Sequence, residues 1–279
     1  ANIVAFHDYW MKRNKLSILM EYCANGTLYD LIRTYRLQKK HFTTAKLQCY
    51  LLELAEALQF CHVELRTVHR DIKPANILID GMGSLKIGDF GLSKELKHQR
   101  DLMCATFCGT PLYLAPEQCR RGEGGYSFPC DVWSLGCVFY ELMALQSPWE
   151  SSPSIERMMQ RIIDEAPDFG EIKQYPERFI DTARWMLNGD PVLRPTATQI
   201  VAHLSLREPP KPPTRAPLLP PAAAAPAVAP KAWCDGGYEA PDARDGSAAS
   251  VTTTVIDGAD DVADDVDAID MHADLKAII

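Results

Sequence analysis

A proline-rich run divides this chain into two unequal parts. Between Pro209 and Pro230, nine of 22 residues are proline and most of the others are alanine. Because proline fixes φ and lacks a backbone N–H, neither a helix nor a sheet ladder can form there, and polyproline II is expected. We therefore predict a folded unit over residues 1–208, a Pro/Ala-rich linker over 209–231, and a separate tail over 232–279.

The tail also differs from the rest of the chain in charge. Residues 1–231 contain 27 Lys or Arg and 25 Asp or Glu, whereas residues 232–279 contain 2 and 12. The net charge of −8 therefore belongs to the tail. A segment this acidic is expected to be disordered, and its charge argues against nucleic acid as a direct partner.

Composition places the folded unit in the soluble globular class. The sequence is 47% hydrophobic and 24% charged, which is typical of globular proteins. The longest apolar stretches, such as 132–145, contain Ser and Glu and fall short of the roughly 18 residues of a membrane span, so no membrane partner is expected. The nine cysteines form no paired CxxC motifs, which favours reduced thiols in a cytoplasmic, nuclear or cytoskeletal location and no zinc site.

Hydrophobic periodicity predicts a mainly helical unit with a small sheet at its start. Residues 3–9 and 16–22 flank the polar turn at 12–15, which predicts an antiparallel pair of strands. A long helix is expected from Thr43 or Thr44, with one apolar face made by Leu47, Tyr50, Leu51, Leu54, Leu58 and Cys61. Further helical patterns cover roughly 128–145, 154–165, 177–187 and 196–205, the last with Thr196 as its cap.

Three spaced motifs identify the family that the chain resembles. Residues 69–76 read HRDIKPAN, residues 89–91 read DFG, and residues 115–117 read APE. In this order they resemble the catalytic loop, the metal-binding triplet and the end of the activation segment of eukaryotic protein kinases. The resemblance covers about residues 1–207 and implies an α+β, protein-kinase-like fold, mainly its helical C-terminal lobe with a remnant of the N-terminal sheet.

The resemblance assigns chemistry to four residues of these motifs. Phosphoryl transfer to a hydroxyl needs a carboxylate that orients the nucleophile and accepts its proton, and Asp71 matches that position. Lys73 would place an ammonium near the transferring phosphate, and a lysine here resembles the serine/threonine branch. Asn76 and Asp89 match the oxygen ligands of Mg²⁺. The implied cofactors are ATP and Mg²⁺.

A nucleotide site is implied by residues 20–28 (MEYCANGTL), which look like a kinase hinge. By this resemblance the backbone of Glu21 and Cys23 would hold the adenine edge, with Met20 behind it as gatekeeper. Leu78 would pack beneath the adenine ring. An apolar pocket with a few backbone polar groups is the usual form of such a site.

The same resemblance implies regulatory and structural roles. Thr106 is the candidate phosphorylation site of the activation segment, where Arg70 would capture the phosphate, and Thr110 matches the threonine of the substrate loop that touches Asp71 and Lys73. The structural matches are a buried Glu117–Arg194 ion pair, Asp131 holding the catalytic-loop backbone, and stacking of Phe6, His69 and Phe90. Residues 20–23, 131–137 and 144–149 further resemble the NimA-related kinases.

Three parts of a complete kinase site are not found in the sequence. The glycine-rich loop, the strand lysine and the helix glutamate all lie upstream of the matched region in the family, and the strand-like start at Ala1, without a signal peptide, looks like a position inside a domain. As it stands, the chain is expected to bind ATP poorly and to transfer phosphate slowly or not at all.

The alternative is a non-catalytic kinase lobe that binds partners through its Pro-rich linker and acidic tail. Residues 210–215 (PKPPTR) fit a polyproline ligand of Src-homology-type domains, although a plain linker is the favoured interpretation of such a stretch. Val262, Val266 and Ile269 are spaced as one face of an acidic helix, with a solvated tail favoured over it. Intact Asp71, Asn76 and Asp89 favour the enzyme.

Overall fold

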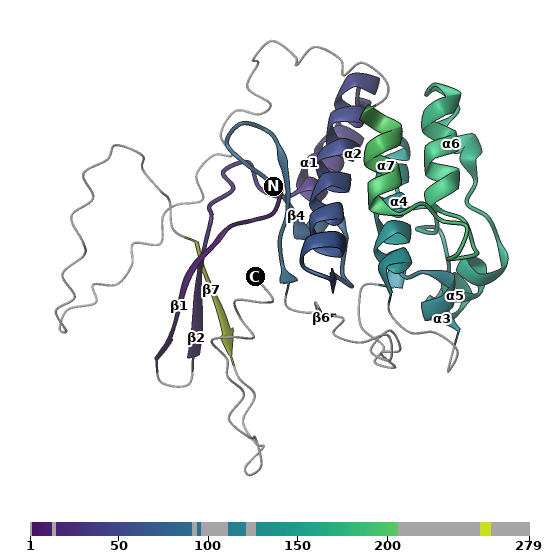
Figure 1. Cartoon of the computed structure of the whole chain (residues 1–279). Helices are drawn as coiled ribbons and strands as arrows, with labels where there is room; N and C mark the ends of the chain where they lie inside the picture. The colour runs from purple at the N-terminus through teal and green to yellow at the C-terminus, as the bar shows by residue number, and fades with distance from the viewer. Residues whose placement is uncertain are drawn as a thin grey trace.

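The computed structural model describes residues 2–12, 15–90, 94–95, 111–120, 127–205 and 252–257. These residues form a small antiparallel sheet beside a lobe of helices (Figure 1). The predicted mainly helical unit with a remnant of sheet is thereby confirmed. No described helix combines the length and apolar character needed to cross a membrane.

The sheet has three antiparallel strands in the order β1-β2-β7. Strands β1 (Phe6–Lys12) and β2 (Lys15–Met20) are the predicted pair, with Tyr9 opposite Ile18 and a register shift between Phe6 and Asp8. The third strand, β7 (Thr252–Asp257), comes from the predicted tail and pairs with β2. The remainder of the predicted linker and tail lies outside the described residues.

Side-chain caps define the first two long helices. Helix α1 (Leu28–Leu37) begins at Thr27, whose Oγ1 accepts a hydrogen bond from the Asp30 N–H, and α2 (Thr44–Gln59) begins at Thr43 in the same manner. Both caps satisfy a backbone donor that the first helical turn leaves unpaired. A π-helical turn (Phe60–Glu64) continues α2. The sequence periodicity predicted α2 and not α1.

The described part of the lobe contains five further helices: α3 (Pro116–Cys119), α4 (Phe128–Ala144), α5 (Ile155–Asp164), α6 (Glu177–Met186) and α7 (Ala197–Ser205). Four of them agree within about a residue with the predicted ranges. Thr196 caps α7 as expected, because its Oγ1 accepts a hydrogen bond from the Gln199 N–H at 3.2 Å. Short 3₁₀ turns lie at Pro74–Asn76, Pro111–Tyr113 and Phe169–Ile172.

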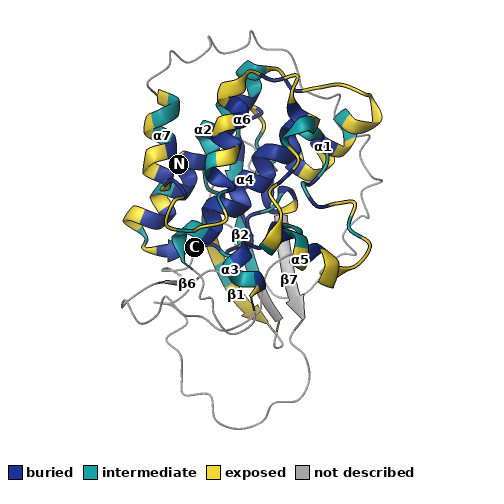
Figure 2. Ribbon diagram, turned by 90° about the vertical axis from the view of Figure 1, so that its right-hand side faces the viewer, coloured by how far each residue is buried: buried dark blue, intermediate teal, exposed yellow. Residues whose placement is uncertain are grey.

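Helix α4 is the centre of the hydrophobic core. Fourteen of its residues, Cys130 to Met143 without interruption, are buried, and Figure 2 shows it dark blue among the other helices. A helix that is apolar on all sides must be enclosed, and α2 and α6 pack against it. The side chains of α4 are therefore held in fixed positions relative to α2 and α6.

Two short antiparallel strand pairs connect the core to the motif residues. Strand β3 (Thr67–Val68) pairs with β6 (Lys94–Glu95), and β4 (Ile77–Ile79) forms a hairpin with β5 (Leu85–Ile87). The sequence between β3 and β4 contains the HRDIKPAN motif, and the DFG motif begins two residues after β5. The β4–β5 hairpin thus sets where the two motifs meet.

The close approach of α4 to α6 depends on Gly136. A Cβ at this position would lie 3.0 Å from Leu187 Cγ and Met186 Cβ. We expect Gly136→Ala to destabilise the fold by about 1–2 kcal/mol in urea unfolding, because overpacking of about 1–3 kcal/mol outweighs the gain in helix propensity. Gly189→Ala, where a Cβ meets nothing within 4 Å, is the matched control and should change stability by less than about 0.5 kcal/mol. Equal stability of both variants would contradict this account of the α4–α6 contact.

Candidate active site

The β4–β5 hairpin brings the two motifs together at one end. Ile77 pairs with Ile87, so the next residues outward face each other, and the Gly88 N–H donates to the Asn76 carbonyl at 2.9 Å. Asp89 follows Gly88 immediately. The antiparallel register therefore places the predicted metal ligands, Asn76 and Asp89, beside the same end of one hairpin.

The Asp71 carboxylate is held by two neighbours in its own loop. It is 8% exposed; Lys73 Nζ donates to its Oδ2 at 2.5 Å, and Asn76 Nδ2 donates to the same oxygen at 2.9 Å. Asn76 Nδ2 also donates to the Asp71 carbonyl at 2.9 Å. The structure thus joins three of the predicted site residues in one cluster. Because the amide nitrogen of Asn76 donates to Asp71, the amide oxygen is the atom of this side chain that could bind a cation.

Asp131, the fourth residue of α4, holds the backbone of the catalytic loop as predicted. Its Oδ2 accepts from the His69 N–H at 2.8 Å and its Oδ1 from the Arg70 N–H at 2.9 Å, while His62 Nε2 lies 2.9 Å from Oδ2. Burial alone raises the pKa of Asp131, but the hydrogen bond and charge of His62, with further contributions from His69 and Arg70, lower the pKa overall. The carboxylate stays ionised in a site that is 1% exposed.

His69 links the loop to the residues before DFG. Its Nε2 donates to the Gly88 carbonyl at 3.1 Å, and its Nδ1 accepts from the Asp71 N–H at 3.3 Å. Burial lowers the pKa of His69, so the ring is neutral and this tautomer is the one that satisfies both contacts. His69 contacts Phe90 edge to face, with ring centroids 4.7 Å apart and an interplanar angle of 67°, so the two rings are neighbours as predicted but are not stacked. Phe6, the third predicted member, pairs with Tyr9.

Left-handed backbone occurs at two positions of the site. Arg70 has φ 71° and Asp89 has φ 59°, a region that residues other than glycine rarely adopt. Such conformations persist where the surroundings impose them, and they concentrate at functional sites. At Arg70 the constraint is the Asp131 hydrogen bond to its N–H.

The hinge residues adjoin β4. The bridge between Thr27 and Leu78, and a hydrogen bond from the Asn25 N–H to the Ile79 carbonyl at 3.0 Å, seat this segment against the hairpin. Glu21 is fixed by its N–H, which donates to the Ala5 carbonyl at 2.8 Å, and by Lys86 Nζ at 2.8 Å from its Oε1. Met20, Glu21, Cys23 and Leu78 are all partly exposed. Each of the predicted nucleotide-contacting residues is therefore accessible to solvent in part.

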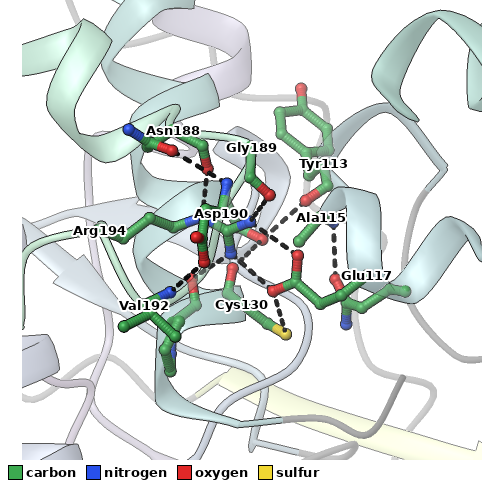
Figure 3. A network of polar contacts seen from close by, with 12 residues as sticks. Tyr113, Ala115, Glu117, Cys130, Asn188, Gly189, Asp190, Val192 and Arg194 are labelled. Carbon is green, nitrogen blue, oxygen red and sulfur yellow. Dashed lines mark hydrogen bonds and ion pairs between the residues drawn. The ribbon is translucent and has the colours of Figure 1, made fainter. Parts of the chain in front are cut away.

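A second polar network ties the APE segment to the loop before α7. Figure 3 shows Arg194 reaching Glu117, with Nη1–Oε1 at 2.6 Å and Nη2–Oε2 at 2.7 Å, which confirms the predicted ion pair. Arg194 Nε also donates to the Asn188 carbonyl at 2.7 Å, and its guanidinium lies 4.9 Å from the Trp133 ring centre. Two parallel hydrogen bonds between one guanidinium and one carboxylate are stronger and more directional than a single one. It anchors the segment that ends at Glu117 on the helical core.

Sequence reasoning missed one contact on this side of the molecule. The Tyr113 hydroxyl donates to Glu141 Oε2 at 2.8 Å, and Ser134 Oγ donates to the Tyr113 carbonyl at 2.8 Å. Burial, followed by the nearby Glu150 charge, raises the pKa of Glu141 to about 7, although the Tyr113 hydrogen bond opposes this. A glutamate within the apolar sequence of α4 indicates that another residue must donate a hydrogen bond to its buried carboxylate. Thr106 and Thr110 lie outside the described residues.

Comparison with known proteins agrees with this geometry. The family model for the protein kinase domain matches residues 1–205. The chain belongs to the protein kinase family. The predicted resemblance to kinases of the serine/threonine branch is confirmed by the relatives, among them a probable serine/threonine-protein kinase, CCRP1, from Zea mays, which is 35% identical over 207 residues.

The relatives include NimA-related kinases and kinases of other groups at similar identity. Human Nek2 is 34% identical over 212 residues, and mitogen-activated protein kinase kinase 3 from Arabidopsis thaliana is 34% identical over 203 residues. These matches and the one to the Zea mays kinase cover 72–74% of this chain and 32–46% of the relatives. The chain therefore spans less than half the length of these curated relatives.

The Glu117–Arg194 pair, in which the Arg194 side chain is buried and that of Glu117 is 14% exposed, predicts a large loss of stability when one partner is removed. Arg194→Met should cost about 3–5 kcal/mol in urea unfolding, because it leaves the largely desolvated Glu117 charge without its counter-ion. Arg184→Met is the matched control, since Arg184 pairs with Asp181 on the surface, and it should cost less than about 1 kcal/mol. Similar losses for the two variants would refute the anchoring role of the Arg194 pair.

Glu141 predicts a pH dependence of folding. Its folded pKa lies above the value of an unfolded glutamate, so its ionisation destabilises the fold as pH rises through about 7. Glu141→Gln should therefore be more stable than the wild type at pH 8.5, by at most about 3 kcal/mol, and this advantage should shrink toward pH 5.5. Urea unfolding at both pH values measures it, with the exposed Glu177→Gln as control. An advantage that does not change with pH would contradict the assignment.

Proposed function

We propose that this chain supplies the hinge and catalytic lobe of a serine/threonine protein kinase, which transfers the γ-phosphoryl group of ATP to Ser or Thr hydroxyls of a protein substrate. The observation that carries the proposal is the cluster in which Lys73 and Asn76 both donate to Asp71 Oδ2. A scaffold has no need of a carboxylate fixed in this manner. Residues 210–215 and 262–269, on which the alternative of a non-catalytic lobe depends, lie outside the described residues.

In the proposed reaction, Asp71 orients the substrate hydroxyl and accepts its proton as the oxygen attacks phosphorus. Lys73, which contacts the same carboxylate, neutralises charge on the transferring group. The adenine would lie against Leu78 and the backbone of Glu21 and Cys23, with Met20 behind it. The Cys23 thiol is a bystander in this chemistry, because burial raises its pKa to about 11 and keeps it protonated.

Magnesium would be held by Asn76 and Asp89. An amide oxygen and a carboxylate are hard oxygen donors of the kind that this cation prefers, and the hairpin register brings the two residues to one end. When bound, the cation neutralises the charge of the ATP phosphates. The oxygen atoms of Asn76 and Asp89 are therefore suitable ligands for a magnesium ion.

Regulation and location belong to the same proposal. Phosphorylation of Thr106 would add a charge that Arg70 can capture, and Thr110 would line the site of the protein substrate next to the turn at Pro111–Tyr113. The proposed compartment is the cytoplasm. The polyproline match at residues 210–215 lies outside the described residues and stays a prediction.

The test separates catalysis from nucleotide binding. In the chain joined to a complete kinase nucleotide lobe upstream of Ala1, Asp71→Asn should lower phosphotransfer to a protein substrate by about 10²–10⁴-fold. ATP affinity should change less than about twofold, because Asp71 acts on the hydroxyl and not on the nucleotide. Radiolabel transfer and calorimetric titration with ATP measure the two quantities.

Asp164→Asn, at the exposed end of α5, is the matched control and should retain full activity. An Asp71→Asn enzyme with undiminished turnover would exclude Asp71 as the base. Absence of transfer in both the wild type and the Asp164→Asn variant would overturn the proposed function itself.

A further inference from the structure

The side chain of Glu21 in the hinge connects three segments of the chain. Its Oε1 lies 2.8 Å from Lys86 Nζ, and its Oε2 accepts hydrogen bonds from Lys86 Nζ at 3.0 Å and from the Ala5 N–H at 3.2 Å. The Glu21 N–H donates in turn to the Ala5 carbonyl at 2.8 Å. One carboxylate therefore joins the hinge to β5 and to the segment that precedes β1.

The Glu21–Lys86 ion pair is largely shielded from water. The side chain of Lys86 is 17% exposed and that of Glu21 is 27% exposed. Burial raises the pKa of Glu21, but the hydrogen bonds from Lys86 and Ala5 lower this pKa overall, so the carboxylate is ionised at neutral pH. Salt screens such a pair less than it screens a pair on the open surface.

Lys86 also lies beside a predicted adenine-contacting residue. The hairpin register places Lys86 opposite Leu78, so the two side chains share one face of the β4–β5 hairpin. The other face is buried and consists of Ile77, Ile79, Leu85 and Ile87. Asp89, a predicted metal ligand, comes three residues after Lys86. Strand β5 thus connects the ion pair to the metal-binding end of the proposed site.

The segment before β1 holds β5 along its other edge. The Ile87 N–H donates to the Asn2 carbonyl, and the Val4 N–H donates to the Ile87 carbonyl, both at 2.9 Å. The next residue of this segment, Ala5, makes the two hydrogen bonds with Glu21. The hinge therefore cannot move relative to β5 without breaking a contact of Glu21.

We propose that Glu21 and Lys86 are positioning residues, whose ion pair holds the adenine-binding hinge in a fixed place relative to Asn76 and Asp89. The proposal deepens the proposed kinase function and, for its effect on nucleotide, rests on it. A ligand that spans both parts of the site, such as ATP with Mg²⁺, gains from an alignment that exists before binding. Adenosine contacts the hinge side alone and gains nothing from it.

Two ligands separate this alignment from general stability. In the chain joined to a complete kinase nucleotide lobe upstream of Ala1, Lys86→Met should weaken binding of ATP with Mg²⁺ about three- to tenfold. Adenosine binding should change less than about twofold, because the hinge backbone is intact. Calorimetric titration measures both affinities. Lys86→Arg, which keeps a cation that can reach Glu21, should restore most of the ATP affinity.

A double-mutant cycle assigns the effect to the pair. Glu21→Gln should weaken ATP binding as Lys86→Met does, and the double variant should be no weaker than either single variant, because one interaction is lost only once. Lys46→Met is the matched control, since Lys46 Nζ donates to the Gly83 carbonyl at 3.3 Å in the turn of the same hairpin. It should leave both affinities within about twofold of the wild type.

Three results of these titrations would overturn the positioning role. They are an unchanged ATP affinity in Lys86→Met, equal losses of ATP and adenosine affinity in that variant, and additive losses in the double variant. A wild-type joined chain that bound neither ligand would instead overturn the proposed function, and with it the effect on nucleotide.

Hydrogen exchange on the 279-residue chain tests the restraint without any nucleotide. Lys86→Met should speed exchange of the amides at 18–21 several-fold and leave those of α2 and α4 unchanged. Unchanged exchange at 18–21 would show that the ion pair does not restrain the hinge. This result stands whether or not the joined chain binds ATP.

Discussion

The arrangement of the site depends on the hydrogen bonds that the ionised carboxylate of Asp131 accepts. It accepts the N–H groups of His69 and Arg70, and His62 lies against the same oxygen that binds the His69 N–H. A buried charge is tolerated only when it is fully hydrogen-bonded, so these donors cannot be released singly at low cost. These hydrogen bonds of Asp131 hold Arg70 in its left-handed conformation and thereby fix the backbone from which the Asp71 side chain projects.

Because Asp131 lies in the first turn of α4, the catalytic loop takes its position from the most buried helix of the molecule. The helix dipole there favours a negative side chain. Farther along α4, Ser134 and Glu141 hold Tyr113, and Gly136 admits α6. A single helix thus fixes the loop around Asp71 and the turn that precedes APE.

Local sequence pattern predicted most of the helices, and the resemblance to kinases predicted two distant contacts, the Glu117–Arg194 pair and the hydrogen bonds of Asp131 to the catalytic loop. Other distant contacts were missed. Caps and periodicity located α2, α4, α5, α6 and α7 closely, and the motifs located the cluster around Asp71, whose members lie within five residues of each other. Helix α1 was missed because it begins directly at the hinge turn and buries only Leu28, Leu31 and Ile32. The Tyr113–Glu141 contact joins residues 28 apart, and no local signal specifies which partner a buried glutamate will find.

Two buried carboxylates on α4 show how neighbours, rather than burial, decide ionisation. Asp131 and Glu141 are both under 10% exposed, and burial alone raises the pKa of each. Asp131 receives several donors, two of them backbone N–H groups whose positions are fixed, so its pKa ends below normal. Glu141 receives a tyrosine hydroxyl and faces the like charge of Glu150, so its pKa stays high. The Asp131 carboxylate is therefore ionised near neutral pH, whereas Glu141, which supports the turn at Tyr113, changes its charge there.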